Sequence, residues 1–337
     1  MRFSKILVAL KPGTDHTPTL RRAANFARNQ GADLSLCAVV DQPTVYDYES
    51  SAYLPPFDFE AIVASERARL TQIVQSTAYA GLSISVKVLL GKQDVEVARL
   101  VEEFQYDLVI KAAGGPRSMA TPSPQREDRT LMRHCPCPVW IVGTAAQADD
   151  GCVLAALDIP ADEEIDLSLN EHILEVSQAI ALAEFRSLHV VHAWHLTGEG
   201  FMRARGNARI NAEVDRMVAR ERVRREKLLH EAVNAAQSRS HRAAIDYLAP
   251  DLHVVNGRPA SVVPRLAKDL KADLIVMGTA ARTGLAGLWL GNTSEKVLKQ
   301  SRSSFLIVKA PPAGQKEGIA ASLTSQSGVP ATEHECA

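Results

Sequence analysis

Long hydrophobic runs are missing from this sequence. Nowhere in its 337 residues is there a stretch close to the roughly 20 consecutive apolar residues that a membrane-spanning helix needs. The first residues, MRFSKILVAL, contain an apolar run of only five and no small-residue cleavage site, so they do not resemble a secretory signal. We therefore expect a soluble, cytoplasmic protein without a membrane span.

A net charge is nearly absent as well. The 38 lysines and arginines balance 39 aspartates and glutamates, which leaves a formal net charge of −1. A balanced chain has no overall field that would attract nucleic acid or an anionic membrane surface, so we predict no nucleic-acid partner. The content of 46 % hydrophobic and 23 % charged residues is that of a globular protein, and the length suggests two domains.

The cysteines do not form a disulfide framework, because they are odd in number and irregularly spaced. They are Cys37, Cys135, Cys137, Cys152 and Cys336. The pair in Cys135-Pro136-Cys137 is compatible with a metal or redox site, or with two structural thiols. It lacks the two-residue spacer of the common zinc and thioredoxin motifs, which favours structural thiols.

Histidines recur at every third position in the segment SLHVVHAWH, at 189, 192 and 195. Neighbouring side chains on a strand point to opposite faces, so His192 is expected to lie on the face opposite to His189 and His195. A three-ligand cluster is therefore disfavoured, and no metal site is predicted.

One unit is written twice in this chain. Three pairs of equivalent residues in the closing parts of the two copies share an offset of 166: Gly91 and Gly257, Asp107 and Asp273, Val139 and Phe305. A constant offset across two loops and a helix indicates an internal duplication. The first apolar runs, 5–10 and 152–157, are offset by only 147, so the second copy carries about 19 extra residues before its third strand.

Each copy alternates short apolar strands with helices. Second strands are expected at 33–40 and 187–194, with helices at 17–30, 58–80, 169–185 and 204–237. Such alternation predicts parallel strands joined by right-handed crossovers. The fold class is therefore α/β: two tandem, doubly wound, Rossmann-like domains with five-stranded parallel sheets. We assign residues 1–147 and 148–312 to the two domains and 313–337 to a disordered tail.

Glycines and a helix start follow the fourth strand of the second copy, where residues 277–298 read MGTAARTGLAGLWLGNTSEKVL. Gly278 lies at the carboxyl end of the strand, where open α/β sheets place ligands. Gly284 and Gly287 leave room for close backbone approach, and Gly291 precedes a helix whose amino terminus suits phosphate. The segment is neither a P-loop nor a Rossmann fingerprint, and its glycines alternatively shape only a tight loop.

The segment resembles the signature of the universal stress protein family, whose ATP-binding members carry Gly-x2-Gly-x9-Gly-Ser/Thr. The matching positions are Gly278, Ala281, Gly291 and Asn292. Ala281 and Asn292 depart from the family pattern, and this weakens the inference of triphosphate binding. The resemblance spans both copies, and it implies the adenine nucleotide alpha hydrolase-like variant of the Rossmann-like fold.

Further residues of the second copy match positions of the family. The resemblance implies that Asp158 contacts adenine, that the backbone of Ala193 meets the base, and that Met277 precedes the glycine motif. Thr293 continues the helix start, and Arg282 either reaches phosphate or lies in solvent. The implied cofactor is ATP or another adenine nucleotide, with Mg²⁺ only as its counter-ion.

The first copy has lost the pattern. Lys11 stands where the acidic residue is expected, and Ala112, Gln125 and Arg126 replace Gly278, Gly291 and Asn292. We expect this copy to bind no nucleotide in the manner of the family and to act as a fused pseudo-dimer partner. By the same resemblance the last strands, 139–142 and 305–308, pair between the copies, and we also consider a homodimer of the tandem.

The favoured function is a stress-response regulatory protein that binds a nucleotide-like small molecule in its second domain and is not a metabolic enzyme. One alternative is a slow ATP hydrolase in the same pocket, although no Ser-His-Asp or Cys-His set can be assembled. Another is a ligand-free scaffold. A third is a carrier of an apolar nucleotide-linked ligand, suggested by Leu285, Leu288, Trp289 and Leu290.

Overall fold

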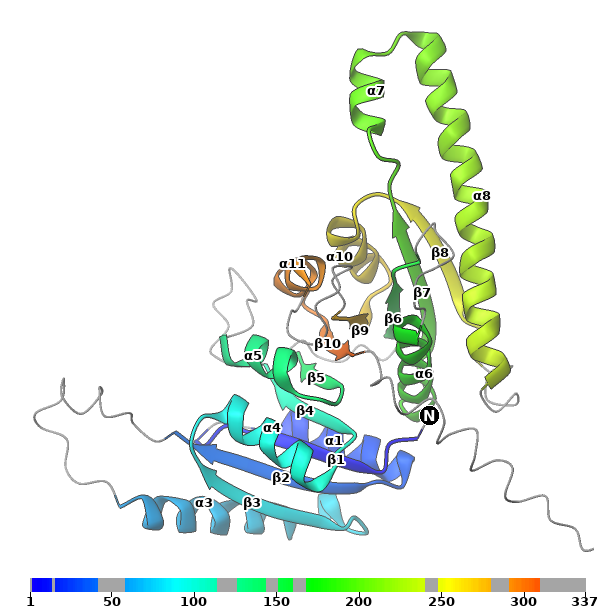
Figure 1. The fold of residues 1–337 in the computed structure, drawn as a ribbon. Coiled ribbons are helices and arrows are strands. Elements are labelled where there is room, and N and C mark those ends of the chain that lie inside the picture. Colours follow the sequence, from blue (N-terminus) through cyan, green and yellow to red (C-terminus); the bar gives the residue numbers. More distant parts are fainter. Residues whose placement is uncertain are drawn as a thin grey trace, which may run out of the picture.

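The structure is a computed structural model, and two similar halves are arranged one above the other in it (Figure 1). It describes residues 2–13, 16–41, 58–113, 126–143, 151–159, 168–239, 248–279 and 291–309. The predicted tail, 313–337, lies outside the described residues.

The first half alternates strands and helices as predicted. Its elements are β1 (Lys5–Leu10), α1 (Thr17–Gln30), β2 (Asp33–Val40), α3 (Phe59–Val74), the 3-10 turn η1 (Thr77–Tyr79), β3 (Ile84–Leu90), α4 (Gln93–Phe104), β4 (Leu108–Ala112), α5 (Arg126–His134) and β5 (Val139–Val142). The strands predicted at 5–10 and 33–40 are confirmed.

The second half repeats this order with one extra helix. Its elements are β6 (Cys152–Leu157), α6 (Ser168–Ala183), β7 (Ser187–Trp194), α7 (Glu199–Arg205), α8 (Ala208–Arg239), β8 (Asp251–Asn256), α10 (Pro259–Asp269), β9 (Ala272–Gly278), α11 (Asn292–Gln300) and β10 (Ser304–Val308). The strands predicted at 152–157 and 187–194 are confirmed.

The ten strands that the structure describes belong to one sheet, in the order β3-β2-β1-β4-β5-β10-β9-β6-β7-β8. Within each half the neighbouring strands are parallel. The central strands β1 and β6 are almost wholly buried, as expected for apolar runs covered by helices on both faces. The predicted fold class is therefore confirmed.

Helices cover both faces of the sheet, and the sheet separates the core into two layers. Apolar residues of α1, α3, α6 and α8 pack on one face, and those of α4, α5, α10 and α11 pack on the other. Phe26 of α1 stacks edge-on against Trp140 of β5 within the first half, with ring centroids 5.5 Å apart, and the first layer includes buried residues of both halves.

The halves join through their last strands. β5 and β10 are antiparallel, and Trp140 pairs with Leu306 at the centre of the register. These two residues are equivalent positions of the repeat, because 306 minus 140 is 166, the offset found in the sequence. A pseudo-twofold axis therefore passes between them, and the predicted pairing of 139–142 with 305–308 is confirmed.

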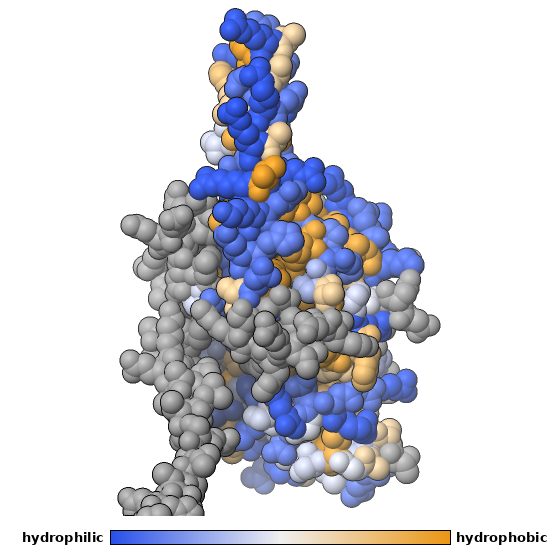
Figure 2. Space-filling view, turned by 90° about the vertical axis from the view of Figure 1, so that its right-hand side faces the viewer, coloured by the Kyte–Doolittle hydropathy of each residue, from blue (hydrophilic) through white to orange (hydrophobic). Residues whose placement is uncertain are grey.

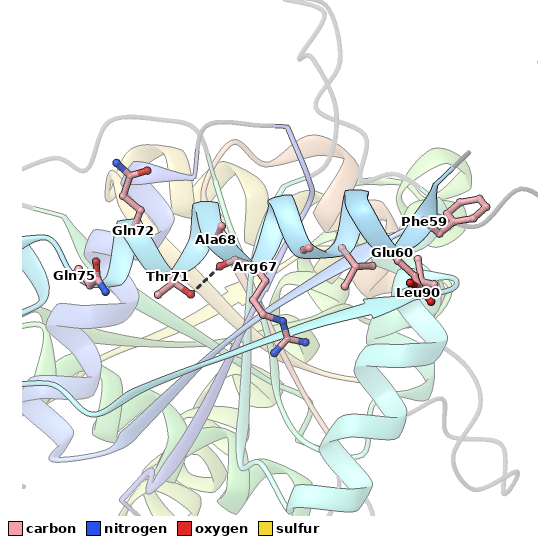
Figure 3. Close-up of a pocket in the computed structure, with 10 residues that line it drawn as sticks. Phe59, Glu60, Arg67, Ala68, Thr71, Gln72, Gln75 and Leu90 are labelled. Atoms are coloured by element: carbon pink, nitrogen blue, oxygen red, sulfur yellow. Dashed lines mark hydrogen bonds between the residues drawn. The ribbon is translucent and has the colours of Figure 1, made fainter. Parts of the chain in front are cut away.

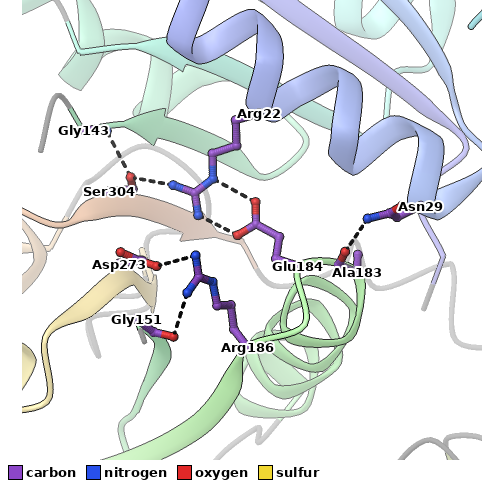
Figure 4. A network of polar contacts seen from close by, with 9 residues as sticks. All are labelled: Arg22, Asn29, Gly143, Gly151, Ala183, Glu184, Arg186, Asp273 and Ser304. Atoms are coloured by element: carbon purple, nitrogen blue, oxygen red, sulfur yellow. Dashed lines mark hydrogen bonds and ion pairs between the residues drawn. The ribbon is translucent and has the colours of Figure 1, made fainter. Parts of the chain in front are cut away.

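A buried polar network reinforces the junction (Figure 4). The guanidinium of Arg22 on α1 makes two bonds to the carboxylate of Glu184, at 2.8 and 2.6 Å. It also donates to the hydroxyl of Ser304, 3.2 Å away, and lies 4.6 Å from the ring centroid of Trp140. Ser304 in turn accepts the backbone amide of Gly143. Both halves thus contribute to one set of interactions.

A helical hairpin built by α7 and α8 projects from the second half (Figure 1). The helix predicted at 204–237 is wrong at its start, because the chain turns at Gly206, where a Cβ atom would lie 2.6 Å from the carbonyl oxygen of Met202. The side chain of Asn207 then accepts the amide of Ile210 and begins α8. Figure 2 shows that the hairpin is largely hydrophilic, with isolated apolar residues.

The start of α1 differs from the prediction by one position. His16, rather than Thr17, is the N-cap residue, while Gly31 ends the helix with a φ of 63° as its sequence position suggested. Among the helices that the structure describes, none is long and apolar enough to cross a membrane.

Candidate functional site

The candidate site lies at the carboxyl ends of β6 and β9. The order of the second half reverses direction between these strands, and such a switch point is where open α/β sheets form a crevice. Leu157 of β6 pairs with His192 of β7, and Ala156 pairs with Met277 of β9. One residue beyond Leu157, Asp158 therefore follows the strand between the ends of β7 and β9.

A buried amide fixes the backbone of Asp158. The side chain of Asn170, in the first turn of α6, accepts the amide of Asp158 at 3.3 Å and donates to its carbonyl oxygen at 2.9 Å. Asn170 is 6 % exposed, whereas the side chain of Asp158 is exposed. The exit of β6 is thus held rigidly while its carboxylate faces outward. The neighbouring Ala193 and Met277 are buried.

The start of α11 is tied to the end of β9. Gly291 is the N-cap residue and supplies no side-chain cap, and the first bond of the helix joins the amide of Glu295 to the carbonyl oxygen of Gly291. The amides of residues 292–294 therefore have no acceptor within the helix. The hydroxyl of Ser294 donates to the carbonyl oxygen of Gly278 at 3.0 Å, which holds the helix start beside the strand end.

The absent side chain of Gly278 serves helix packing. A Cβ atom there would lie 2.6 Å from Cδ2 of Leu169 and 3.2 Å from Cδ1 of Ile173, both on α6. From the sequence, Gly278 was expected at the carboxyl end of a strand, where open α/β sheets place ligands. The contact with α6 accounts for the glycine by itself, whether or not a ligand binds.

We expect Gly278→Ala to lower the free energy of unfolding by about 1–3 kcal/mol, because the new methyl group overpacks the contact with Leu169. Chemical denaturation measures the change. Leu169→Ala in the same chain should relieve the overpacking, and Gly200→Ala is the control because a Cβ atom there meets open space. If Leu169→Ala gives no relief, the packing explanation is wrong.

The remaining positions of the predicted site lie outside the described residues. These are Ala281 and Arg282, together with the apolar residues Leu285, Leu288, Trp289 and Leu290. Asn292 is exposed and Thr293 is half-buried at the start of α11. The described members of the predicted set are therefore grouped at one edge of the sheet, and their ligand roles stay predictions.

The histidines of β7 have different surroundings. His192 is buried and lies beneath the exit of β6, with Nδ1 3.4 Å from the amide of Ile159, and Arg225 of α8 donates to the carbonyl oxygen of Ile159 at 2.7 Å. His189 lies on the other face, 3.0 Å from the imidazole of His253. Burial and the neighbouring His189 lower the pKa of His253. The predicted separation of the faces is confirmed for these two histidines.

The first half carries a buried ion pair at the equivalent place. Lys111 of β4 and Asp128 of α5 are in direct contact, with side chains 5 % and 0 % exposed. By the offset of 166 they correspond to Met277 and Ser294. The candidate site of the second half is thus replaced, in the first half, by an internal contact between strand and helix.

The first-half residues that stand at the positions of the site differ in their exposure. Lys11 is exposed, and the imidazole of His16 holds its backbone, with Nε2 3.1 Å from the amide nitrogen and 2.5 Å from the carbonyl oxygen. His16 therefore parallels Asn170. Ala112 is half-buried, Gln125 lies outside the described residues, and nothing is described of the Arg126 side chain.

A separate groove of about 680 Å³ runs along α3 (Figure 3). Leu90 and apolar residues of α3 line much of it, and the hydroxyl of Thr71 is already bonded to the carbonyl oxygen of Arg67 at 2.8 Å. The groove lacks the convergent polar groups of a small-molecule site. We therefore keep the candidate site at β6 and β9.

Asn170 and Ser294 were not among the predicted site residues. Ser294 follows the predicted motif directly, so its position was a usable signal. Asn170 had none, because its counterpart in the first half is a histidine at a different offset. In chemical terms the described site offers one exposed carboxylate, a helix amino terminus and backbone groups. This set suits binding of an anion-bearing molecule and holds no nucleophile–base pair.

Comparison with known proteins finds relatives that match most of this chain. The sequence profile described as the Universal stress protein family matches residues 2–143 and 165–309. Universal stress protein E of Salmonella typhi is 28 % identical over 318 residues, which cover 91 % of this chain and 94 % of that protein. Its namesake from Escherichia coli K12 is 28 % identical over 316 residues, with the same coverage.

Solved structures share the fold over the whole tandem. A putative universal stress protein from Pseudomonas aeruginosa UCBPP-PA14 superposes with a TM-score of 0.61 at 24 % identity, covering 96 % of this chain and 97 % of that one. One from Archaeoglobus fulgidus gives 0.59 at 15 % identity, covering 91 % and 98 %. With two profile matches across most of its length, this chain belongs to the universal stress protein family.

Proposed function

We propose that the second half binds a nucleotide-like small molecule, ATP or another adenine nucleotide, at the carboxyl ends of β6 and β9. The observation that carries the proposal is the start of α11, where Gly291 supplies no side-chain cap and Ser294 ties the helix to the end of β9. An uncapped helix start offers backbone amides and the positive end of a helix dipole to a phosphate.

In this proposal the base lies near Asp158 and the phosphates near residues 291–293. The exposed carboxylate accepts hydrogen bonds from the base or the ribose, and the firm hold of Asn170 on its backbone keeps it in place. Ala193 and Met277 form the apolar floor. Ala281 and Arg282 belong to the proposed set by their positions in the motif, and Mg²⁺ would accompany the nucleotide.

The first half serves as a fixed partner in this proposal. Lys111 and Asp128 form an ion pair where the second half has Met277 and Ser294. The positive charge of Lys111 is therefore neutralised within the protein and does not favour an anionic ligand. Membership in the family supports a general role in stress response. We propose a binding protein rather than an enzyme, because the described site offers no nucleophile with a neighbouring general base.

Two variants test the site. The backbone of Gly291, with φ −61° and ψ 146°, is open to any residue, so Gly291→Val covers the helix start without backbone strain. We expect Gly291→Val and Asp158→Asn each to weaken ATP binding about tenfold or more, which corresponds to about 1.4 kcal/mol. Isothermal titration calorimetry of the full chain measures this, and native mass spectrometry of freshly purified protein detects a retained ligand.

Lys11→Gln is the matched control, since Lys11 holds the position of Asp158 in the first half and should not affect binding. Absence of saturable binding in the unaltered chain, with no retained molecule, would overturn the proposal in favour of a ligand-free scaffold. Phosphate release that disappears in Gly291→Val would instead establish the slow hydrolase. A retained ligand with an acyl chain would identify a carrier.

A further inference from the structure

Two thiols face each other where the first half meets the second. Cys135 follows α5 and Cys137 precedes β5, and their sulfur atoms are 3.6 Å apart. Cys135 is buried and Cys137 is half-buried. The amide of Cys135 is bonded to the carbonyl oxygen of Leu131, and Pro136 fixes the backbone between the two. The pair is therefore held in place before any reaction.

The surroundings of this pair differ from those of the single buried cysteines. Burial raises the pKa of Cys37 to about 12 and that of Cys152 to about 11. In the pair, the two sulfurs are within hydrogen-bond distance and either can be the donor. This hydrogen bond lowers the pKa of Cys135 and raises that of Cys137. The first proton of the pair is thus lost more readily than the proton of an isolated buried thiol.

Charged groups from several elements face the pair. Lys309 follows β10 of the second half, and its ammonium donates to the carbonyl oxygen of Arg133 at 2.5 Å. Its positive charge favours a thiolate on Cys135. The negative charge of Glu102 disfavours that thiolate, and the negative charge of Asp107 disfavours a thiolate on Cys137. Burial lowers the pKa of Lys309. The cation that stabilises the pair therefore comes from the other half of the chain.

We propose that Cys135 and Cys137 form a reversible dithiol–disulfide site that hydroperoxides oxidise. The two sulfurs share one proton, so a minor fraction of the thiolate is on Cys137, the less buried residue of the two. That thiolate attacks a peroxide oxygen, the O–O bond breaks, and Cys137 becomes a sulfenic acid while the released alkoxide or hydroxide takes a proton from water. Cys135 then attacks the oxidised sulfur, and the expelled hydroxide leaves as water with the proton of Cys135.

The net reaction converts two thiols and one hydroperoxide into a disulfide, one alcohol or water molecule, and one further water molecule. A dithiol reductant reverses it by thiol–disulfide exchange. The site is independent of the proposed nucleotide site, although it lies next to it. Arg133, whose carbonyl oxygen holds Lys309, also pairs with Glu295 in the first turn of α11 at 2.6 Å.

Peptide mapping of the full chain tests the proposal. After brief treatment with hydrogen peroxide and alkylation, the peptide with Cys135 and Cys137 should be two hydrogen atoms lighter and unalkylated, and it should become alkylated after reduction. Cys37 and Cys152 should remain reduced during the peroxide treatment. Because both are buried, they are alkylated after the peroxide is quenched and the protein is unfolded. Cys135→Ser should stop at a sulfenic acid on Cys137, which dimedone labels.

Lys309→Met should slow the oxidation about tenfold by removing the cation, and Lys299→Met, an exposed lysine of α11, should not. The disulfide must also form in Cys336→Ser. The proposal is overturned if the pair stays alkylatable at peroxide levels that already oxidise Cys37 and Cys152. It is equally overturned if the product is a cross-link to Cys336.

Discussion

Replacing Lys111 with methionine is expected to lower the free energy of unfolding by about 3–5 kcal/mol, because it removes the cation from a fully buried carboxylate. Methionine is the residue that the second half has at this position, Met277. The loss therefore does not come from an unsuitable side chain as such. It comes from the charge that is left on Asp128.

The double variant Lys111→Met with Asp128→Ser installs the pair of the second half, and we expect it to recover most of the loss. Urea unfolding followed by circular dichroism measures both variants. Lys268→Met, at an exposed lysine of α10, should change the stability by no more than about 0.5 kcal/mol. If the double variant is as unstable as the single variant, the methionine and serine of the second half cannot replace the lysine and aspartate of the first half.

Arg22→Ala is expected to cost a similar amount, about 3–5 kcal/mol, because it leaves Glu184 at the junction without its bidentate cation. The loss should be concentrated where the halves meet, so unfolding should change from one transition to two. Arg22→Lys should recover little, since an ammonium group cannot reproduce both bonds of the guanidinium.

Differential scanning calorimetry distinguishes the outcomes, with Arg21→Ala as the control because Arg21 is the exposed neighbour on the same helix. A single transition in Arg22→Ala, with a midpoint equal to that of the control, would mean that the other contacts between the halves hold them together without Arg22.

The repeat made much of the fold predictable. The family resemblance anticipated which strands meet at the junction, and apolar runs indicated the bounds of β1, β2, β6 and β7. The break before α8 was missed although the sequence signals it, because Gly206 disfavours a helix interior and Asn207 is a preferred N-cap residue.

The position of the candidate site was predictable from topology, since strand order alone locates the switch point. The reasons for individual residues were less accessible. The packing role of Gly278 depends on how closely α6 approaches β9. The contact between Lys111 and Asp128 joins a strand to a helix 17 residues later, and nothing in the sequence indicates that both charges are buried.

The junction has a consequence for assembly. β5 and β10 hydrogen-bond to each other, so neither offers an open rim to another molecule, and within the described sheet the outermost strands are β3 and β8. Because the two partners at the junction are covalently tethered, each meets the other at an effective concentration on the order of millimolar. Dilution that would separate two independent chains should leave the two halves of this chain assembled.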